Sequence, residues 1–215
     1  MKILLCAATE MEIAPTLQQL SGIEKHSIEL VITGVGLMTS TYALAKGISI
    51  HQPQLVIQAG IAGTLEAEQV LGDVVAVQAE TVGDLGVLEK TGFHSLFDLN
   101  LLSVDLSPWK AGQLVNEHDV LKNIGLPLVN GVTVNEISTD EATISYYREH
   151  LNAQVETMEG AALHYVTLME RIPFLQIRSL SNYIGERDKS KWEMKKAIAN
   201  LNKELQNLLN KDFRL

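Results

Sequence analysis

Acidic, basic and amide side chains follow several short apolar runs of the sequence, and such side chains can bind and process a small polar ligand. Glu12 comes just after the first run and Glu159 just after the sixth. Arg178 and Asn182 stand at the end of the seventh run. Two carboxylates, an arginine and an amide are groups that general acid–base catalysis uses. Because ligands of α/β sheets collect at the carboxyl ends of the strands, these residues predict a site at one sheet edge.

Each of these residues also has an ordinary structural explanation. Glu12 and Glu159 could complement the dipole at the start of a helix, as acids there commonly do. Arg178 could pair with a surface acid, and Asn182 could cap a turn. Their convergence at one sheet edge favours the functional interpretation.

Glycine-bearing segments at residues 34–36 and 60–63 follow the second and third apolar runs, and we expect both to be turns that let backbone approach a ligand. The first lacks the later glycine and the acid of a dinucleotide-binding fingerprint. The histidines show no paired spacing of the kind that metal ligands have, and a Gly-x-Ser-x-Gly motif is absent. The sequence therefore predicts a site with neither a cofactor nor a metal.

The elements that must position these residues are short apolar strands alternating with helices. The expected strands are residues 2–8, 30–33, 55–59, 73–77, 126–134, 154–158 and 174–180. The expected helices are residues 10–20, 37–50, 140–150, 159–171 and 191–209. Continuous apolar strands are typical of a sheet buried on both faces. The alternation predicts an α/β fold, a three-layer αβα sandwich around a central mixed, twisted sheet.

The remaining segments of the sequence change this predicted fold little. Residues 80–122 show no clear periodicity, so we expect long loops there. No linker, repeat or low-complexity segment interrupts the sequence, and a length of 215 residues suits one domain over 1–215.

Charge and composition disfavour several classes of partner. The 17 Lys and Arg residues against 26 Asp and Glu give a net charge of −9, which disfavours nucleic acid and anionic membranes. The first arginine is Arg148, so an arginine clamp for phosphate cannot come from the preceding residues. Cys6 is the only cysteine, which excludes an intramolecular disulfide. The opening apolar run is too short for a secretory signal, and no run would cross a bilayer, so we expect a cytoplasmic location.

Taken in chain order, a set of short motifs resembles the nucleoside phosphorylase/nucleosidase superfamily. They are Glu12, Gly34-Val35-Gly36, Ala59-Gly60-Ile61-Ala62-Gly63, Gly72-Asp73-Val74-Val75, Met158-Glu159-Gly160 and Arg178-Ser179-Leu180-Ser181-Asn182. The 5′-methylthioadenosine/S-adenosylhomocysteine nucleosidases share the context of Glu12 and the Met-Glu pair. The segments 83–86, 92–97, 133–135 and 181–188, with Trp192, look more like futalosine hydrolase of menaquinone biosynthesis.

The resemblance implies a role for each matched residue. Glu12 is then the general base that polarises the attacking water, and Glu159 binds the ribose hydroxyls. Met158 packs beneath the sugar, and Arg178 orients the water and the acids. The other expected substrate-binding residues are Gly63, Ala62, Ile137, Phe97 and Ser181. The base could stack on Ile137, Asn135 or Phe97.

Asn182 carries the expectation about the base. In the methylthioadenosine branch an aspartic acid at this position donates a proton toward purine N7, which an amide cannot do. An amide can instead satisfy N7 and a 6-oxo group together, which points to a hypoxanthine-type base. Ile61 departs from the methylthioadenosine branch, which carries a serine there near the water.

The resemblance therefore implies hydrolysis of futalosine, a purine nucleoside, to hypoxanthine and dehypoxanthine futalosine, with water as the nucleophile and no cofactor. Methylthioadenosine/S-adenosylhomocysteine nucleosidase and purine nucleoside phosphorylase activity remain alternatives, as does a non-catalytic nucleoside-binding paralogue. Phosphorylases of the superfamily bind phosphate with N-terminal arginines, which are absent here, so hydrolysis is favoured.

Two further expectations follow from the resemblance. The chain should form a homodimer or a larger homo-oligomer, with residues 92–102 as a candidate contact. The aromatic carboxylate of futalosine should meet a cation or hydrogen-bond donor, for which Arg187, Lys189 and His94 are candidates.

Overall fold

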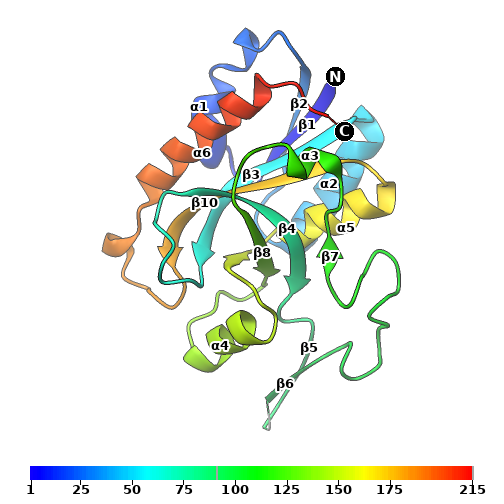
Figure 1. Ribbon diagram of the computed structural model, residues 1–215, viewed down its shortest axis with the longest axis vertical. Helices are drawn as coiled ribbons and strands as arrows, with labels where there is room; N and C mark the ends of the chain where they lie inside the picture. Colours follow the sequence, from blue (N-terminus) through cyan, green and yellow to red (C-terminus); the bar gives the residue numbers. More distant parts are fainter. Residues whose placement is uncertain (91, 215) are drawn as a thin grey trace.

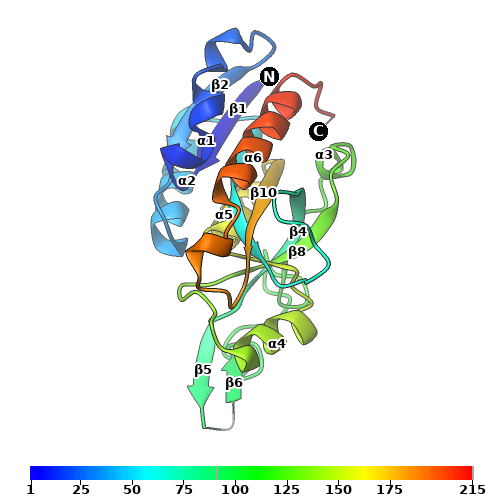
Figure 2. The same cartoon turned by 90° about the vertical axis from the view of Figure 1, so that its left-hand side faces the viewer.

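A computed structural model describes residues 1–90 and 92–214, in which helices cover both faces of a central sheet (Figures 1 and 2). Helices α1 (Glu10–Leu17) and α6 (Met194–Leu209) pack together on one face. Helices α2 (Leu37–His51) and α5 (Gly160–Glu170) pack together on the other. The structure confirms the α/β fold with a central mixed sheet.

The chain builds its main sheet from strands far apart in sequence. The strands of this sheet are β1 (Lys2–Ala7), β2 (Ser27–Ile32), β3 (Leu55–Thr64), β4 (Val74–Val82), β7 (Leu114–Val115), β8 (Leu128–Thr133), β9 (Val155–Thr157) and β10 (Phe174–Tyr183). A separate hairpin consists of β5 (Gly86–Glu89) and β6 (Gly92–Ser95). Two short helices are α3 (Asp119–Lys122) and α4 (Glu141–Glu149).

The main sheet curls back on itself. Its order is β10-β4-β8-β9-β3-β1-β2, and β10 also pairs with β3, which closes five of the strands into a ring. Strand β3 is parallel to β1 and β10 and antiparallel to β9, so it links the open part of the sheet to the ring. The twist of adjacent strands allows this closure. The carboxyl ends of β1, β3 and β10 therefore converge.

Strands β3 and β10 are longer than the sequence predicts. The prediction of a glycine turn at residues 60–63 is wrong, because β3 continues through this segment to Thr64. A side chain at Gly60 would collide with the guanidinium of Arg178 and approach the carboxylate of Glu12. The glycine therefore lets two long side chains cross a strand, and it does not end that strand.

The prediction of long loops over residues 80–122 is wrong in part. The segment contains the end of β4, the β5–β6 hairpin, β7 and α3. The hairpin extends away from the rest of the fold (Figure 2), and Val87 and Leu88 on β5 are both exposed, so neither strand shows an alternating apolar pattern. From Leu96 to Gln113 the chain has no regular element, and Trp109 anchors this segment by packing with Leu114 of β7 and Ala161 of α5.

The helices are held by two apolar layers. On one face of the sheet, α6 buries an apolar stripe of Ala197, Leu201, Leu205, Leu208 and Leu209. On the other face, Leu44 and Ile48 of α2 pack with Leu163 and Val166 of α5. Within residues 1–90 and 92–214, no helix combines the length and apolar character that a membrane span requires.

A single buried amide ties α6 to α1. Asn202 Oδ1 accepts from the Thr16 N–H at 3.0 Å and from its hydroxyl at 2.7 Å. Asn202 Nδ2 donates to the Glu12 carbonyl at 2.8 Å and to the Ile198 carbonyl at 2.7 Å. The Glu12 carbonyl and the Thr16 N–H are the pair that an uninterrupted α-helix joins directly. The amide thus bridges the turn of α1 that contains Pro15.

We expect Asn202→Ala to lower the free energy of unfolding by about 2–4 kcal/mol, because it leaves buried donors and a carbonyl of α1 without partners. Urea unfolding followed by circular dichroism measures the change. Asn207→Ala is the matched control, since Asn207 is exposed on the same helix. Similar losses in the two variants would show that the bridge does not stabilise the fold.

Candidate active site

The converging strand ends enclose a pocket of about 270 Å³. Its lining comes from the start of α1, the ends of β3, β9 and β10, and the loops around them. The lining residues are Ala8, Thr9, Met11, Glu12, Val35, Ile61, Ala62, Gly63, Ile137, Glu156, Thr157, Met158, Glu159, Asn182, Ile184, Arg187 and Trp192. The structure therefore brings most of the predicted site residues together.

Glu12 is buried at the first turn of α1, with both carboxylate oxygens held by donors. Oε2 accepts from the Thr9 N–H at 3.0 Å and from the Thr9 hydroxyl at 2.9 Å. Oε1 accepts from the Ile61 N–H at 3.1 Å, which ties α1 to β3. The N-terminal end of the helix also favours a negative charge there. These contacts fix one carboxylate at the pocket wall.

Glu159 lies at the start of α5 and provides the second carboxylate. Its Oε1 accepts from the Gly36 N–H at 3.0 Å, and its Oε2 lies 3.8 Å from Nη2 of Arg178. Gly36 has φ of 95°, a left-handed conformation that glycine adopts without strain. The turn at residues 34–36 therefore aims a backbone donor at a carboxylate of the site.

Arg178 lies beneath the pocket and is only 1% exposed. Its Nη2 donates to Gln58 at 2.7 Å, and its Nε and Nη2 donate to Oε1 of Gln176 at 3.3 and 3.2 Å. Its Nη1 donates to the Ile61 carbonyl at 3.4 Å. The guanidinium thus influences the pocket indirectly, because it contacts Glu159 and the Ile61 carbonyl, which both belong to lining residues.

Glu80 is a functional candidate that the sequence reasoning missed. It is fully buried, and its Oε1 accepts from Gln176 at 2.8 Å while its Oε2 accepts from the Thr133 hydroxyl at 2.9 Å. Burial raises the pKa of Glu80 to about 7, although the hydrogen bonds from Gln176 and Thr133 and the charge of Arg178 oppose that rise. A charged residue inside a mostly apolar strand is the signal that could have revealed it.

Asn182 reaches the pocket through an irregularity in β10. The register of β10 on β3 shifts between Leu180 and Asn182, so that Asn182 lies opposite Gly63. One extra residue moves a side chain to the other face of a sheet. The Ser181 hydroxyl donates to Asn182 Oδ1 at 2.8 Å, and the amide nitrogen, which donates to the Tyr183 carbonyl at 3.3 Å, lies near Gly63.

The remaining predicted residues fall inside and outside the pocket. Met158, Ala62 and Ile137 line it, while Ser181 is buried behind it, with its hydroxyl oxygen 3.1 Å from the Ala62 carbonyl oxygen. Phe97 lies outside the lining and packs edge-on against Trp109, with ring centroids 5.3 Å apart.

The three polar candidates for binding a substrate carboxylate are also separated. Arg187 lines the pocket, with its guanidinium 5.7 Å from the centre of the Trp192 ring. Lys189 and His94 are not among the lining residues. Asn135, a candidate for stacking on the base, also lies outside the lining and hydrogen-bonds Asp84 at the surface. Throughout residues 1–90 and 92–214, no group of three or more His, Cys, Asp or Glu side chains has an arrangement suited to a metal.

We expect Glu80→Gln to flatten the pH dependence of stability. The pKa of about 7 in the folded protein lies above the ordinary 4.5, so unfolding becomes easier as pH rises between these values. The wild type should lose roughly 3 kcal/mol over this window through Glu80, with no further loss above it. Glutamine cannot ionise, so the variant should keep its stability between pH 5 and 7 and exceed the wild type at pH 8.

Urea unfolding at pH 5, 6, 7 and 8 tests this expectation. Glu68→Gln, which removes an exposed carboxylate, serves as the control and should follow the wild type. Parallel pH profiles for the Glu80 variant and the wild type would refute a raised pKa at Glu80.

Comparison with known proteins identifies the family of this chain. Residues 19–211 match the phosphorylase superfamily. A futalosine hydrolase of Thermus thermophilus is 30% identical over 186 residues, which cover 82% of this chain and 79% of that protein. The structure of a 5′-methylthioadenosine/S-adenosylhomocysteine nucleosidase of Helicobacter pylori matches with a TM-score of 0.81 at 17% identity, over 97% of each chain. A futalosine hydrolase structure from the same organism gives a TM-score of 0.81 at 18% identity, also over 97% of each chain. The chain belongs to the phosphorylase superfamily and is an enzyme of its nucleosidase group, which hydrolyses N-glycosidic bonds.

Proposed function

We propose that this protein hydrolyses the N-glycosidic bond of futalosine and releases hypoxanthine and dehypoxanthine futalosine. The observation that carries the proposal is the amide of Asn182 at the pocket wall, with its oxygen engaged by Ser181. The amide nitrogen is then the group offered to the base. Hypoxanthine presents two acceptors, N7 and O6, on one edge, whereas adenine presents N7 beside an amino donor. One hydrogen of the Asn182 nitrogen is donated to the Tyr183 carbonyl at 3.3 Å, so the other is offered to the base, where it meets acceptors on the hypoxanthine edge and lies unfavourably beside the amino group of adenine.

Glu12 is the proposed general base. Oε2 is held by two donors of Thr9, whereas Oε1 accepts only from the Ile61 N–H and so has a further lone pair that can take a proton from water. The fixed position matters because a general base must lie within hydrogen-bond reach of the proton that it removes.

Glu159 and Met158 are the proposed sugar-binding pair. Glu159 keeps lone pairs free beside its contacts to Gly36 and Arg178, and these can accept hydrogen bonds from ribose hydroxyls. Cleavage of the glycosidic bond places positive charge on the sugar, so a nearby carboxylate stabilises the transition state more than the substrate. Met158 offers an adaptable apolar surface to the sugar ring.

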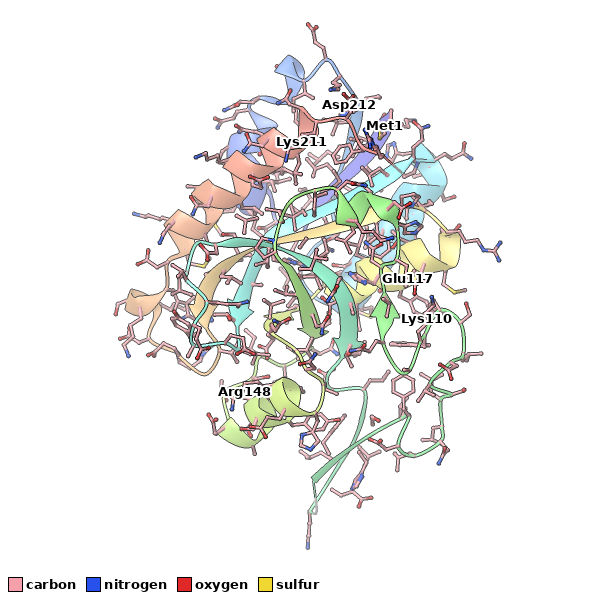
Figure 3. All side chains as sticks on the ribbon, viewed as in Figure 1. Met1, Lys110, Glu117, Arg148, Lys211 and Asp212 are labelled. Atoms are coloured by element: carbon pink, nitrogen blue, oxygen red, sulfur yellow. The ribbon has the colours of Figure 1, made fainter. Side chains whose placement is uncertain are left out.

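The distribution of arginines supports water as the nucleophile. Among the arginines, Arg148 lies on α4 near Glu141 and Glu149 (Figure 3), and Arg178 is already engaged beneath the pocket. Arg187 lines the pocket beside Trp192, where it suits the aromatic carboxylate of futalosine. A phosphate nucleophile at the sugar would need a cluster of donors there.

A substrate panel tests the proposal. Futalosine, 5′-methylthioadenosine and S-adenosylhomocysteine are each incubated with the protein, with and without phosphate, and base release is followed by chromatography. We expect hypoxanthine release from futalosine with kcat/KM at least about tenfold above adenine release from the other two, unaffected by phosphate. More efficient release of adenine than of hypoxanthine would refute the proposed substrate. Formation of a sugar phosphate would show that phosphate, and not water, is the nucleophile.

Glu12→Gln provides the inactive control for the panel. It should lower kcat by about 10²–10⁴-fold, because the amide cannot accept a proton from water. Thermal stabilisation by hypoxanthine should persist, since the base end of the pocket is unchanged. Loss of that stabilisation would point to a damaged fold.

We also propose a homodimer or a larger assembly. Within residues 92–102, Phe97 and Leu102 pack internally, but Leu99 and Leu101 are exposed. Light scattering should give a mass of at least two chains, and replacing both leucines with serine should raise the monomer fraction. Leu106→Ser, on the same loop and also exposed, is the control. A wild-type mass of 23.6 kDa would overturn the proposal.

A further inference from the structure

Glu80 is a buried carboxylate that the proposed reaction does not use. It lies on β4, is fully buried and is not among the residues that line the pocket. Burying a carboxylate costs free energy unless donors or a cation surround it. The donors at Glu80 are the Gln176 amide and the Thr133 hydroxyl. The further contacts of these two donors show what the carboxylate holds in place.

The carboxylate of Glu80 lies against the first residues of α5. A side chain at Gly160, the residue after Glu159, would collide with Glu80 Oε1. Glu80 Oε2 accepts from the Thr133 hydroxyl at 2.9 Å, and the Thr133 oxygen accepts from the Ala161 N–H at 2.8 Å. The first N–H groups of a helix need acceptors and favour a negative charge. Glu80 is therefore anchored at the helix end that carries Glu159.

The other oxygen of Glu80 fixes the orientation of the Gln176 amide. Gln176 Nε2 donates to Glu80 Oε1 at 2.8 Å and lies 3.4 Å from His164 Nε2. His164 Nδ1 lies 2.8 Å from the Leu114 carbonyl, which can only accept, so Nδ1 carries the hydrogen and Nε2 presents a lone pair. Burial lowers the pKa of His164 to about 3, so the ring is neutral at neutral pH. Because both acceptors face the NH2 group of Gln176, its oxygen points away from them.

The oxygen of Gln176 in turn holds the guanidinium of Arg178. Nε and Nη2 of Arg178 donate to Gln176 Oε1 at 3.3 and 3.2 Å, and Nη2 lies 3.8 Å from Glu159 Oε2. If the amide were reversed, its NH2 group would face the guanidinium, and neither group can accept a hydrogen bond. A chain of buried contacts therefore runs from Glu80 through Gln176 and Arg178 to a carboxylate of the pocket.

We infer that Glu80 is a positioning residue, which holds the Glu159 carboxylate in place through Gln176 and Arg178; this inference rests on the proposed function, which puts Glu159 at the ribose. A small displacement of a group that acts on the reacting sugar can lower the rate strongly. Since a carboxylate there stabilises the transition state more than the substrate, its displacement should lower kcat more than it changes KM.

Glu80→Leu tests the inference, because leucine has a similar size and removes both acceptors. Base release is measured on folded protein, with the nucleoside that the wild type hydrolyses most efficiently. We expect kcat to fall at least about tenfold while KM changes less than about threefold. Glu80→Gln is the conservative variant. Its amide oxygen can still accept from Gln176, so its kcat should stay within about threefold of the wild-type value.

Asn116→Leu is the matched control for a loss of stability. Asn116 is buried, and its amide donates to the Phe174 carbonyl at 2.7 Å, at the end of β10 that lies away from the pocket. This variant should lose stability but keep the wild-type kcat. A fall in its kcat as large as that of Glu80→Leu would show that destabilisation alone explains the loss, and the inference would be wrong.

A double-mutant cycle with Glu159→Gln tests the path of the effect. If Glu80 acts through Glu159, adding Glu80→Leu to Glu159→Gln should lower kcat further by less than about threefold. Equal fold-changes in the two backgrounds would overturn the inference. A wild-type kcat in Glu80→Leu, or equal losses in Glu80→Leu and Glu80→Gln, would also overturn it.

Glu80→Asp covers the case in which the leucine variant does not fold. Aspartate keeps the charge but is one methylene shorter, so its carboxylate cannot reach both Gln176 and Thr133. The same fall in kcat is expected, and a wild-type kcat would refute the positioning role. The proposed function fails separately: a wild-type kcat in Glu159→Gln would refute the role of Glu159 at the sugar, whereas a wild-type kcat in the Glu80 variants leaves that role intact.

Discussion

The buried guanidinium of Arg178 is the group on which the arrangement of the site depends. A permanently charged side chain with 1% exposure must have its donors satisfied inside the protein, since its desolvation costs several kcal/mol. Gln58, Gln176 and the Ile61 carbonyl supply acceptors, and Glu159 supplies the opposite charge. Gly60 must lack a side chain so that the guanidinium can pass. The charge of one residue thus dictates the types of several neighbours on separate strands.

Two ionisable groups near Arg178 are neutral, whereas the Glu159 carboxylate lies 3.8 Å from its Nη2. Burial lowers the pKa of His164 to about 3 and raises that of Cys6 to about 12, so at neutral pH neither side chain is charged. The two carboxylates at the pocket are held by backbone donors from distant segments, Ile61 for Glu12 and Gly36 for Glu159. Such fixed groups need no rearrangement when charge develops on a sugar, which is the advantage of a preorganised site.

The base end of the pocket is built by strand register. A shift of one residue in β10 moves Asn182 opposite Gly63, and the short strand β9 brings Glu156 to the other side of the same glycine. An amide and a carboxylate that are 26 residues apart therefore flank one position without belonging to a common motif. In the proposed reaction Asn182 contacts the base, while Glu12 and Glu159 act at the sugar.

The sequence by itself determined the parts of this protein that depend on local pattern and residue type. The helix α6 and the first strands follow from the local pattern of apolar residues, and the ordered motifs from Glu12 to Asn182 identified the family. Only the tertiary structure decided that β3 runs through Gly60–Gly63, that the sheet closes through β10, and that Phe97 packs on Trp109 away from the pocket. Local patterns act between residues two to four positions apart, whereas these features depend on pairing between distant strands. Glu80 shows the same limit, because the environment of a carboxylate in a strand depends on the partners that folding brings to it.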